Sequence, residues 1–347
     1  MIRSTTNPSG PGHNWVKHRF KPQTHSMQVR KDLLDEDGMK EPPRLSIKSH
    51  IDENKALLEN DPDYKQRIAA SAENEAQKKA WLHGDWDIIS GGMFDDVWSP
   101  RYNVILPFDI PDRWRITRSF DWGASRPFSV GWWAVSNGED VQLRDGTWRS
   151  TLKGDVFRIK EWYGSTGKPN EGLNMLASEI SEGIVRRELE WGWRNQGENW
   201  CRVKGGIADS QIFAAENGNC IATDMKTKVR LDDGFKYPGI MWSPADKRPG
   251  SRTTGWTQMR QRLKNAHPTL KKDLEGNILA VFPREKPGMF IFTVCSQFIE
   301  TVPVLPRDEK NMDDVNTDAE DHIADEARYL IRSLAQIGSS GATTGHH

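Results

Sequence analysis

Two aspartates stand at the ends of short strand-like segments, where a carboxylate can take part in catalysis. The segment 113–123 alternates apolar and polar side chains and carries Asp121 near its end, while the small-residue segment 203–209 ends in Asp209. If the two strands are parallel neighbours, both carboxylates meet at one edge of a sheet and repel each other unless a cation lies between them. The pair therefore predicts a divalent metal site, while a turn-forming role for each aspartate stays open.

Three further candidates, Asp321, His322 and Asp325, lie in an acidic segment near the C-terminus. A Thr-x-x-Glu capping box at 317–320 predicts a helix over 318–334. The two aspartates are four residues apart and share one helix face, with the histidine on the flank. A solvated helix face would carry the same residues, but acids in excess of capping needs, with an imidazole within reach, favour metal ligation.

Charge is unevenly distributed although the formal net charge is only −1. Residues 241–290 hold ten Lys or Arg against four acids, and residues 300–326 hold ten acids against two basic residues. A basic stretch beside an acidic one is typical of a protein that grips a polyanion and handles it with metal ions, although two solvated faces of opposite charge would look the same. Lys247, Arg248 and Arg252 are the candidates for sequence-independent phosphate contacts.

The elements that must position these residues lie in the second half of the chain. Residues 1–95 are polar, with one helical stretch at 56–81; residues 96–112 are expected to be a connection, 113–336 a folded domain and 337–347 a flexible tail. The expected strands are 114–121, 128–135, 155–163, 203–209 and 289–293, and the expected helices are 170–191, 254–266 and 318–334. The first three strands predict an antiparallel meander. The whole order predicts an α/β fold, a mixed sheet with helices on its faces.

Composition excludes several classes of protein. The 347 residues include 15 Trp, too many for a disordered chain, and no apolar run approaches the roughly 18 residues of a membrane span. The start of the chain lacks the apolar core of a signal peptide. The 3 cysteines form no C-x-x-C pair, which argues against a disulfide scaffold or a cysteine zinc site. We therefore expect a cytoplasmic protein with no membrane partner.

Several motifs together resemble a known family. The first motif combines Thr5-Thr6-Asn7-Pro8 with residues 10–16. The others are residues 84–87, 120–123, 208–210, 244–248 and 320–329. They resemble the large terminase subunit of tailed bacteriophages, the motor that packages viral DNA, over nearly all of the chain. The resemblance implies a ribonuclease H-like nuclease domain, preceded by a polar remnant of the ATPase domain and linker.

The resemblance also implies roles for the acidic residues. Asp121, Asp209 and Asp325 match the three catalytic acids that hold two divalent metal ions, Mg²⁺ or Mn²⁺. His322 matches a histidine found in one branch of the family, and the adjacent Asp321 is expected to assist as a further ligand. The sequence thus predicts a two-metal site built from these five residues.

Two other features bear on the resemblance. The segment Thr5-Thr6-Asn7 matches the motif that couples nucleotide hydrolysis to movement, but no phosphate loop precedes it, so this chain alone is not expected to hydrolyse ATP. Glu326 stands where relatives often carry a small or apolar residue, which bears on how closely the last helix packs.

The implied function is a metal-dependent endonuclease that cuts double-stranded viral DNA when packaging begins and ends. The implied partners are double-stranded DNA, the portal ring, the small terminase subunit and the procapsid, on which the protein would dock transiently in the host cytoplasm. Two alternatives stay open. One is a structure-selective DNA resolvase with the same fold and carboxylates; the other is a non-catalytic module that grips DNA or docks on the portal ring.

Overall fold

The computed structural model describes residues 5–6, 16, 20, 26–31, 43–72, 75–86, 92–168, 170–215, 219–272, 278–308 and 310–341. The chain divides into two compact units, residues 1–95 with 303–307 and residues 96–302 with 308–347. The second unit contains the main sheet and all of the candidate acidic residues. Among the described residues, no helix is both long and apolar enough to cross a membrane.

The first unit contains short helices. They are η1 (Ile51–Glu53), α2 (Lys55–Asn60), α3 (Tyr64–Ser71) and α4 (Glu75–His83). The prediction of one continuous helical stretch over 56–81 is wrong, because α2 ends at Asn60 and the residue after it, Asp61, precedes Pro62. A residue that precedes proline avoids the helical conformation, so the chain cannot continue the helix there.

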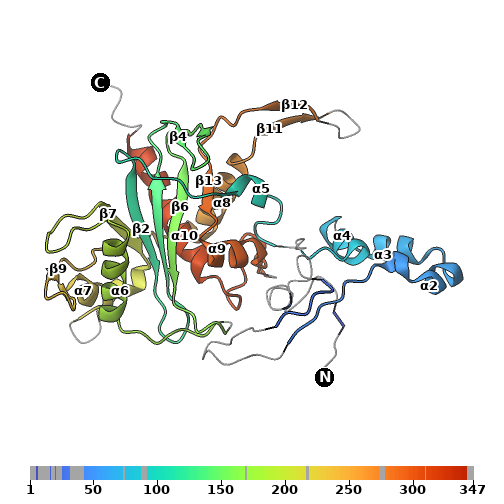
Figure 1. Ribbon diagram of the computed structural model, residues 1–347, viewed down its shortest axis with the longest axis horizontal. Coiled ribbons are helices and arrows are strands. Elements are labelled where there is room, and N and C mark those ends of the chain that lie inside the picture. Colours follow the sequence, from blue (N-terminus) through green and yellow to red (C-terminus); the bar gives the residue numbers. More distant parts are fainter. Residues whose placement is uncertain are drawn as a thin grey trace. The chain divides into compact units, whose positions relative to one another are not determined.

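Seven strands form a mixed sheet in the second unit, in the order β1-β13-β6-β3-β2-β7-β10 (Figure 1). Their bounds are β1 (Val104–Ile105), β2 (Arg115–Asp121), β3 (Ser129–Val135), β6 (Val156–Tyr163), β7 (Val203–Ala208), β10 (Ser243–Pro244) and β13 (Met289–Phe292). β2, β3 and β6 pair antiparallel, as the predicted meander requires, whereas β7 lies parallel to β2 and β10 parallel to β7. The predicted mixed sheet is confirmed.

Residues 96–112, expected to be only a connection, contribute to this sheet. α5 (Pro100–Asn103) leads into β1, which pairs in parallel with β13 at one edge. The buried amide of Asn103 donates to the backbone oxygens of Leu263 and Met289 (3.0 and 3.3 Å), which fixes the segment to the domain. A two-residue strand gives no alternating pattern, so the sequence does not reveal it.

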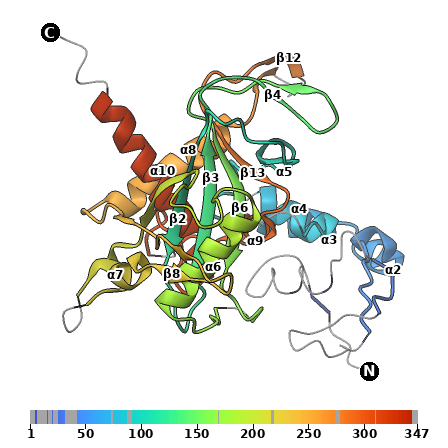
Figure 2. The same cartoon turned by 60° about the vertical axis from the view of Figure 1, so that its left-hand side comes forward.

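Helices cover both faces of the sheet (Figures 1 and 2). The neighbouring tryptophans of β3 show this arrangement: Trp132 Nε1 donates to Glu188 of α6 (Ala177–Glu190), while Trp133 Nε1 donates to Glu326 of α10 (His322–Gly341). Because alternate residues of a strand point to opposite faces, α6 and α10 lie on opposite sides of the sheet. α8 (Ser251–Asn265) packs against α10.

The remaining elements are short. They are η2 (Ser210–Phe213), α7 (Ile221–Lys226), α9 (Ser296–Thr301), η3 (Val302–Val304) and three hairpins, β4–β5 (Val141–Gln142, Trp148–Arg149), β8–β9 (Val229–Arg230, Lys236–Tyr237) and β11–β12 (Thr269–Lys272, Ile278–Phe282). The hairpins pair only within themselves, so they do not extend the main sheet.

The last helix differs from the prediction at both ends. α10 spans His322–Gly341, so it begins four residues later than the capping box predicts. Glu320 does not act as the second half of that box, because its carboxylate accepts a hydrogen bond from the Tyr163 hydroxyl (2.8 Å). The helix also continues through residues 337–341, which we expect in the flexible tail; residues 342–347 lie outside the described part of the chain.

Candidate functional site

Asp121 ends β2 and Asp209 directly follows β7, at the same edge of the sheet. β2 and β7 are parallel, with Phe120 opposite Ala208, and the backbone N–H of Asp209 donates to the carbonyl of Phe120 (3.0 Å). Both aspartates are buried, and Asp209 begins η2 by accepting a hydrogen bond from the backbone N–H of Gln211 (3.0 Å). The parallel pairing on which the predicted convergence depends is therefore present.

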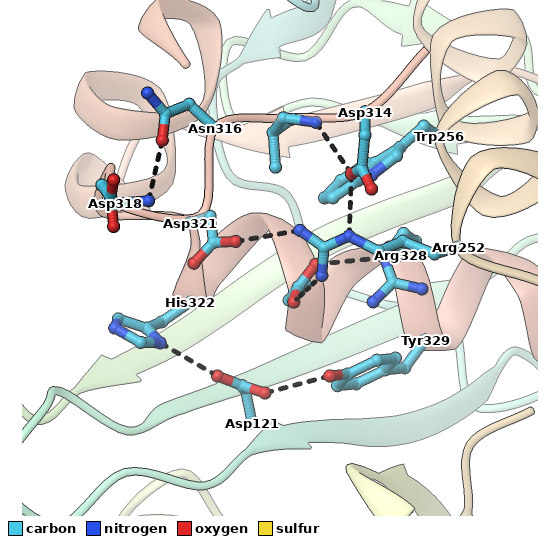
Figure 3. Close-up of polar contacts among 12 residues, drawn as sticks. Asp121, Arg252, Trp256, Asp314, Asn316, Asp318, Asp321, His322, Arg328 and Tyr329 are labelled. Atoms are coloured by element: carbon cyan, nitrogen blue, oxygen red, sulfur yellow. Dashed lines mark hydrogen bonds and ion pairs between the residues drawn. The ribbon is translucent and has the colours of Figure 1, made fainter. Parts of the chain in front are cut away.

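The start of α10 lies over the end of β2 (Figure 3). His322 Nδ1 is 3.2 Å from Asp121 Oδ2, and the Tyr329 hydroxyl donates to Asp121 Oδ1 over 3.2 Å. Both oxygens of Asp121 are thus held by side chains of one helix. Sequence reasoning missed Tyr329, although the spacing of His322, Asp325 and Tyr329 places all three on one helix face.

Negative charge is concentrated in this buried region. Burial raises the pKa of Asp121 to about 7, and the charges of Asp325 and Asp209 add to that rise while the hydrogen bond with His322 opposes it. The pKa of Asp321 is raised to about 6 by burial and by the nearby Asp325. Burial lowers the pKa of His322, but its contact with Asp121 outweighs that effect and the net shift is upward. A positive charge entering here would be strongly favoured.

Arginines contact the acidic side chains of this region (Figure 3). Arg252 of α8 donates to Asp314 (2.7 Å), Asp325 (2.9 Å) and Asp321 (3.1 Å), and Arg328 donates to the other oxygen of Asp325 (3.1 Å). Asp321 and Asp325 are both buried. The alternative of a solvated helix face is therefore wrong, because the polar face of α10 packs against α8 instead of facing water.

The three cations predicted to bind phosphate all contact carboxylates. Lys247 Nζ lies 2.5 Å from Asp209 Oδ1. Arg248 makes a bidentate contact with Asp246, in which Nε donates to Oδ1 and Nη2 to Oδ2, each over 2.9 Å. The side chains of Lys247, Arg248 and Arg252 nevertheless remain 45%, 73% and 30% exposed. Each cation thus has a carboxylate contact and an open side, and phosphate contact stays a prediction.

Glu326, the residue that the resemblance marks as unusual, anchors α10 to the sheet. It is fully buried and accepts hydrogen bonds from Arg158 Nη1 (2.6 Å), Ser129 Oγ (3.1 Å), Trp133 Nε1 (3.1 Å) and the hydroxyl of Ser119. Because every one of these partners comes from the sheet, the carboxylate fixes the rotation of α10 about its axis. The rotation of α10 in turn sets the position of the side chain of Asp325, the residue before Glu326.

The donor set suits a divalent cation. Within the part of the chain that the structure describes, no three His, Cys, Asp or Glu side chains are arranged around one common point that could hold an ion. The charges are nevertheless unbalanced: the carboxylates are Asp121, Asp209, Asp314, Asp321 and Asp325, and the basic side chains among them are Lys247, Arg252 and Arg328. His322 Nε2 is buried and has no hydrogen-bond partner among the described residues. Oxygen and imidazole donors are the kinds that Mg²⁺ and Mn²⁺ take, while Lys247 and Arg252 contact two of the carboxylates, so metal binding stays a prediction.

No family model and no curated protein matches the chain. The chain is similar in structure to large terminases of bacteriophages. The nuclease domain of the P22 large terminase is 16% identical, with a TM-score of 0.42, and the match covers 70% of this chain and 91% of that one. The large terminase of a thermophilic bacteriophage is 16% identical, with a TM-score of 0.45, over 95% of this chain and 62% of that one. The same thermophilic phage protein in complex with ADP is 15% identical, with a TM-score of 0.46. The chain therefore spans less than two thirds of that full-length terminase.

The segment that resembles the terminase coupling motif lies in the first unit. Thr5 and Thr6 are exposed, and Asn7 lies outside the described residues. A role for this segment in coupling nucleotide hydrolysis to movement stays a prediction.

Proposed function

We propose that this chain is a metal-dependent endonuclease that cleaves double-stranded viral DNA during genome packaging. The observation that carries the proposal is the meeting of acidic groups from distant parts of the chain at one buried edge of the sheet. Asp121 ends β2 there, and Asp209 follows the adjacent parallel strand β7. His322 contacts Asp121 directly, and Asp325 is near enough for its charge to raise the pKa of Asp121. A fold tolerates such repulsion where function requires it.

In this proposal Asp121, Asp209 and Asp325, with His322 and Asp321 beside them, hold two divalent ions. Those ions would supply an activated water and would stabilise charge on the leaving oxygen of the cleaved strand. The protein's own contribution is to position the ligands. Tyr329 and His322 hold the two oxygens of Asp121.

The proposal extends to the packaging motor as a whole. Lys247, Arg248 and Arg252 would contact phosphates through their exposed ends, which gives affinity without sequence preference. By the family resemblance, the portal ring, the small terminase subunit and the procapsid are the further partners, met in the host cytoplasm. ATP hydrolysis by this chain alone is not part of the proposal, because its sequence contains no phosphate loop.

The test is cleavage of supercoiled plasmid in EDTA, Mg²⁺ and Mn²⁺. Wild type should nick and linearise the plasmid only with a divalent ion, and Asp121→Asn, Asp209→Asn and Asp325→Asn should each be inactive while keeping the wild-type circular dichroism spectrum. Asp313→Asn is the matched control, since this exposed aspartate lies in the same acidic stretch without contacting the site. Wild-type nicking by Asp121→Asn would refute the assignment of the site.

Two further outcomes would favour the alternatives. Faster cleavage of a four-way junction than of linear duplex would indicate a structure-selective resolvase. Metal-independent binding of duplex with no nicking at any Mn²⁺ concentration would indicate a module that grips DNA without cutting it.

A further inference from the structure

Two of the three proposed catalytic aspartates are already paired with basic side chains from one segment. The segment 243–256 runs from β10 into α8 and supplies both Lys247, which contacts Asp209, and Arg252, which contacts Asp325. Asp121 differs, since its side-chain contacts among the described residues are with His322 and Tyr329. The pairing is therefore selective, and it joins one continuous stretch of chain to ligands contributed by two different elements.

The side chains of the two cations are partly exposed. Lys247 and Arg252 have side chains 45% and 30% exposed, so each has a path into solvent. Arg328 does not, because its side chain is only 6% exposed. Of the three basic side chains that contact these aspartates, Arg328 is therefore enclosed, whereas Lys247 and Arg252 are open to solvent.

A releasable cation and a metal ion compete for the same carboxylate. Like charges a few ångströms apart repel, and the repulsion is stronger in a partly buried site than in water. An ammonium or guanidinium on a carboxylate also uses the oxygen lone pairs that a metal would need. A metal ion can therefore bind tightly only when Lys247 and Arg252 have another partner, and DNA phosphates are such a partner.

We propose that Lys247 and Arg252 are exchangeable counterions, which cover Asp209 and Asp325 in the free protein and move to DNA phosphates when duplex binds. This inference rests on the nuclease function proposed above and adds its regulation. Duplex and divalent metal then bind cooperatively, and the coupling is reciprocal: metal tightens DNA binding by the same factor by which DNA tightens metal binding. The site takes up its ions when a substrate is present.

The first test measures Mn²⁺ binding without DNA, from the electron paramagnetic resonance signal of free Mn²⁺. Lys247→Gln and Arg252→Gln should each bind Mn²⁺ at least about tenfold more tightly than wild type, because a competing charge has been removed. Arg260→Gln is the matched control: it makes the same charge change on α8, about two turns beyond Arg252, where the arginine contacts Asp96. Its Mn²⁺ affinity should equal that of wild type.

The second test measures duplex affinity by fluorescence anisotropy with and without Mn²⁺, on a short phosphorothioate duplex that resists cleavage, at constant ionic strength. Mn²⁺ should tighten wild-type binding at least about tenfold and should have a much smaller effect on Lys247→Gln and Arg252→Gln. Asp325→Asn, which lacks a ligand, reports the general effect of the ion on DNA. Circular dichroism and thermal midpoints establish that each variant is folded. Since Lys247 makes one ion pair and its own side chain is 45% exposed, its variant keeps the test decisive if Arg252→Gln unfolds.

The outcomes separate the inference from the function on which it rests. If both glutamine variants bind Mn²⁺ as weakly as wild type, or more weakly, the cations position the carboxylates and do not compete for them, and the inference is wrong. Equal duplex affinity of wild type with and without Mn²⁺ also overturns it, while leaving the nuclease proposal intact. A wild-type protein that binds duplex but binds no Mn²⁺, with or without DNA, refutes the nuclease proposal itself.

Discussion

The loss of the buried ion pair between Glu326 and Arg158 should lower the stability of the fold strongly. Both side chains are fully buried, and Arg158 Nη1 lies 2.6 Å from Glu326 Oε2. In Glu326→Ala, Arg158 keeps Glu161 (3.1 Å) as an anionic partner, and the hydroxyl of Ser129 loses its carboxylate acceptor. Trp133 Nε1 loses one of its two acceptors and keeps the hydroxyl of Ser119 (2.6 Å). Removing one partner of a buried pair costs about 3–5 kcal/mol. Because Glu161 remains, we expect the lower end, about 3 kcal/mol, which for a unit of this size lowers the thermal midpoint by roughly 6–12 °C.

The assay is urea denaturation followed by tryptophan fluorescence and circular dichroism. Glu182→Ala is the matched control, since Glu182 pairs with Arg186 one turn later on the exposed side of α6, and such surface pairs contribute about 0.3–0.5 kcal/mol. Replacing both partners, Arg158→Met with Glu326→Leu, should recover part of the loss because no unpaired charge stays buried. If Glu326→Ala lowers the free energy of unfolding by less than about 1 kcal/mol, an effect close to that of the surface control, the reasoning is refuted.

Three further predictions concern the site itself. Because burial raises the pKa of Asp121 to about 7, ionisation of this group lowers the stability of the metal-free fold progressively between about pH 4 and 7. The thermal midpoint of Asp121→Asn in EDTA should therefore exceed that of wild type at pH 8 and match it near pH 4. Equal midpoints at pH 8 would contradict this prediction. Tyr329→Phe, which removes one hydrogen bond to Asp121, should lower kcat for plasmid cleavage by roughly tenfold with little change in KM, as loss of an outer contact to a ligand does; a change in KM alone would count against a positioning role. His322→Ala should keep some Mn²⁺-supported cleavage but lose the preference for Mn²⁺ over Mg²⁺, because imidazole favours the softer ion; an unchanged ratio of initial rates would exclude His322 as a ligand.

Much of the sheet could be predicted because strands carry a local signal. Alternation of apolar and polar residues placed β2 within one residue of its observed start, and the short turns between the first three strands predicted the observed meander. The positions of Asp121 and Asp209 follow from the same local pattern, since a residue that ends a strand lies at a sheet edge wherever that strand pairs. The parallel pairing of β2 with β7 brings the two edges together, and it depends on contacts that no short window of sequence contains.

The start of α10 could not be predicted from its own segment. The capping box predicts a helix from 318, but the carboxylate of Glu320 is taken by Tyr163, which is 157 residues away in the chain. A tertiary hydrogen bond thus outweighs a local one. The burial of Glu326 is another such case: a charged residue in an acidic stretch is expected to face water, yet Arg158, a residue of β6, draws it inward.

The opposed charge runs at 241–290 and 300–326 show the same limit and explain the electrostatics of the site. Sequence alone leaves two interpretations, a surface that grips a polyanion and two independent solvated faces. Neither interpretation predicts that the basic and acidic stretches contact each other directly. They do so through Arg252, whose guanidinium contacts aspartates 62 to 73 residues away in the chain. The neutralisation is incomplete, because Asp121 contacts only His322 and Tyr329 among the described residues, and its raised pKa reflects the burial and the repulsion that remain. Incomplete pairing reconciles a stable fold with a site for cations. In the free protein Arg252 and Arg328 contact the acidic segment, and the residual negative charge lies at the sheet edge, where we propose that metal ions and DNA meet.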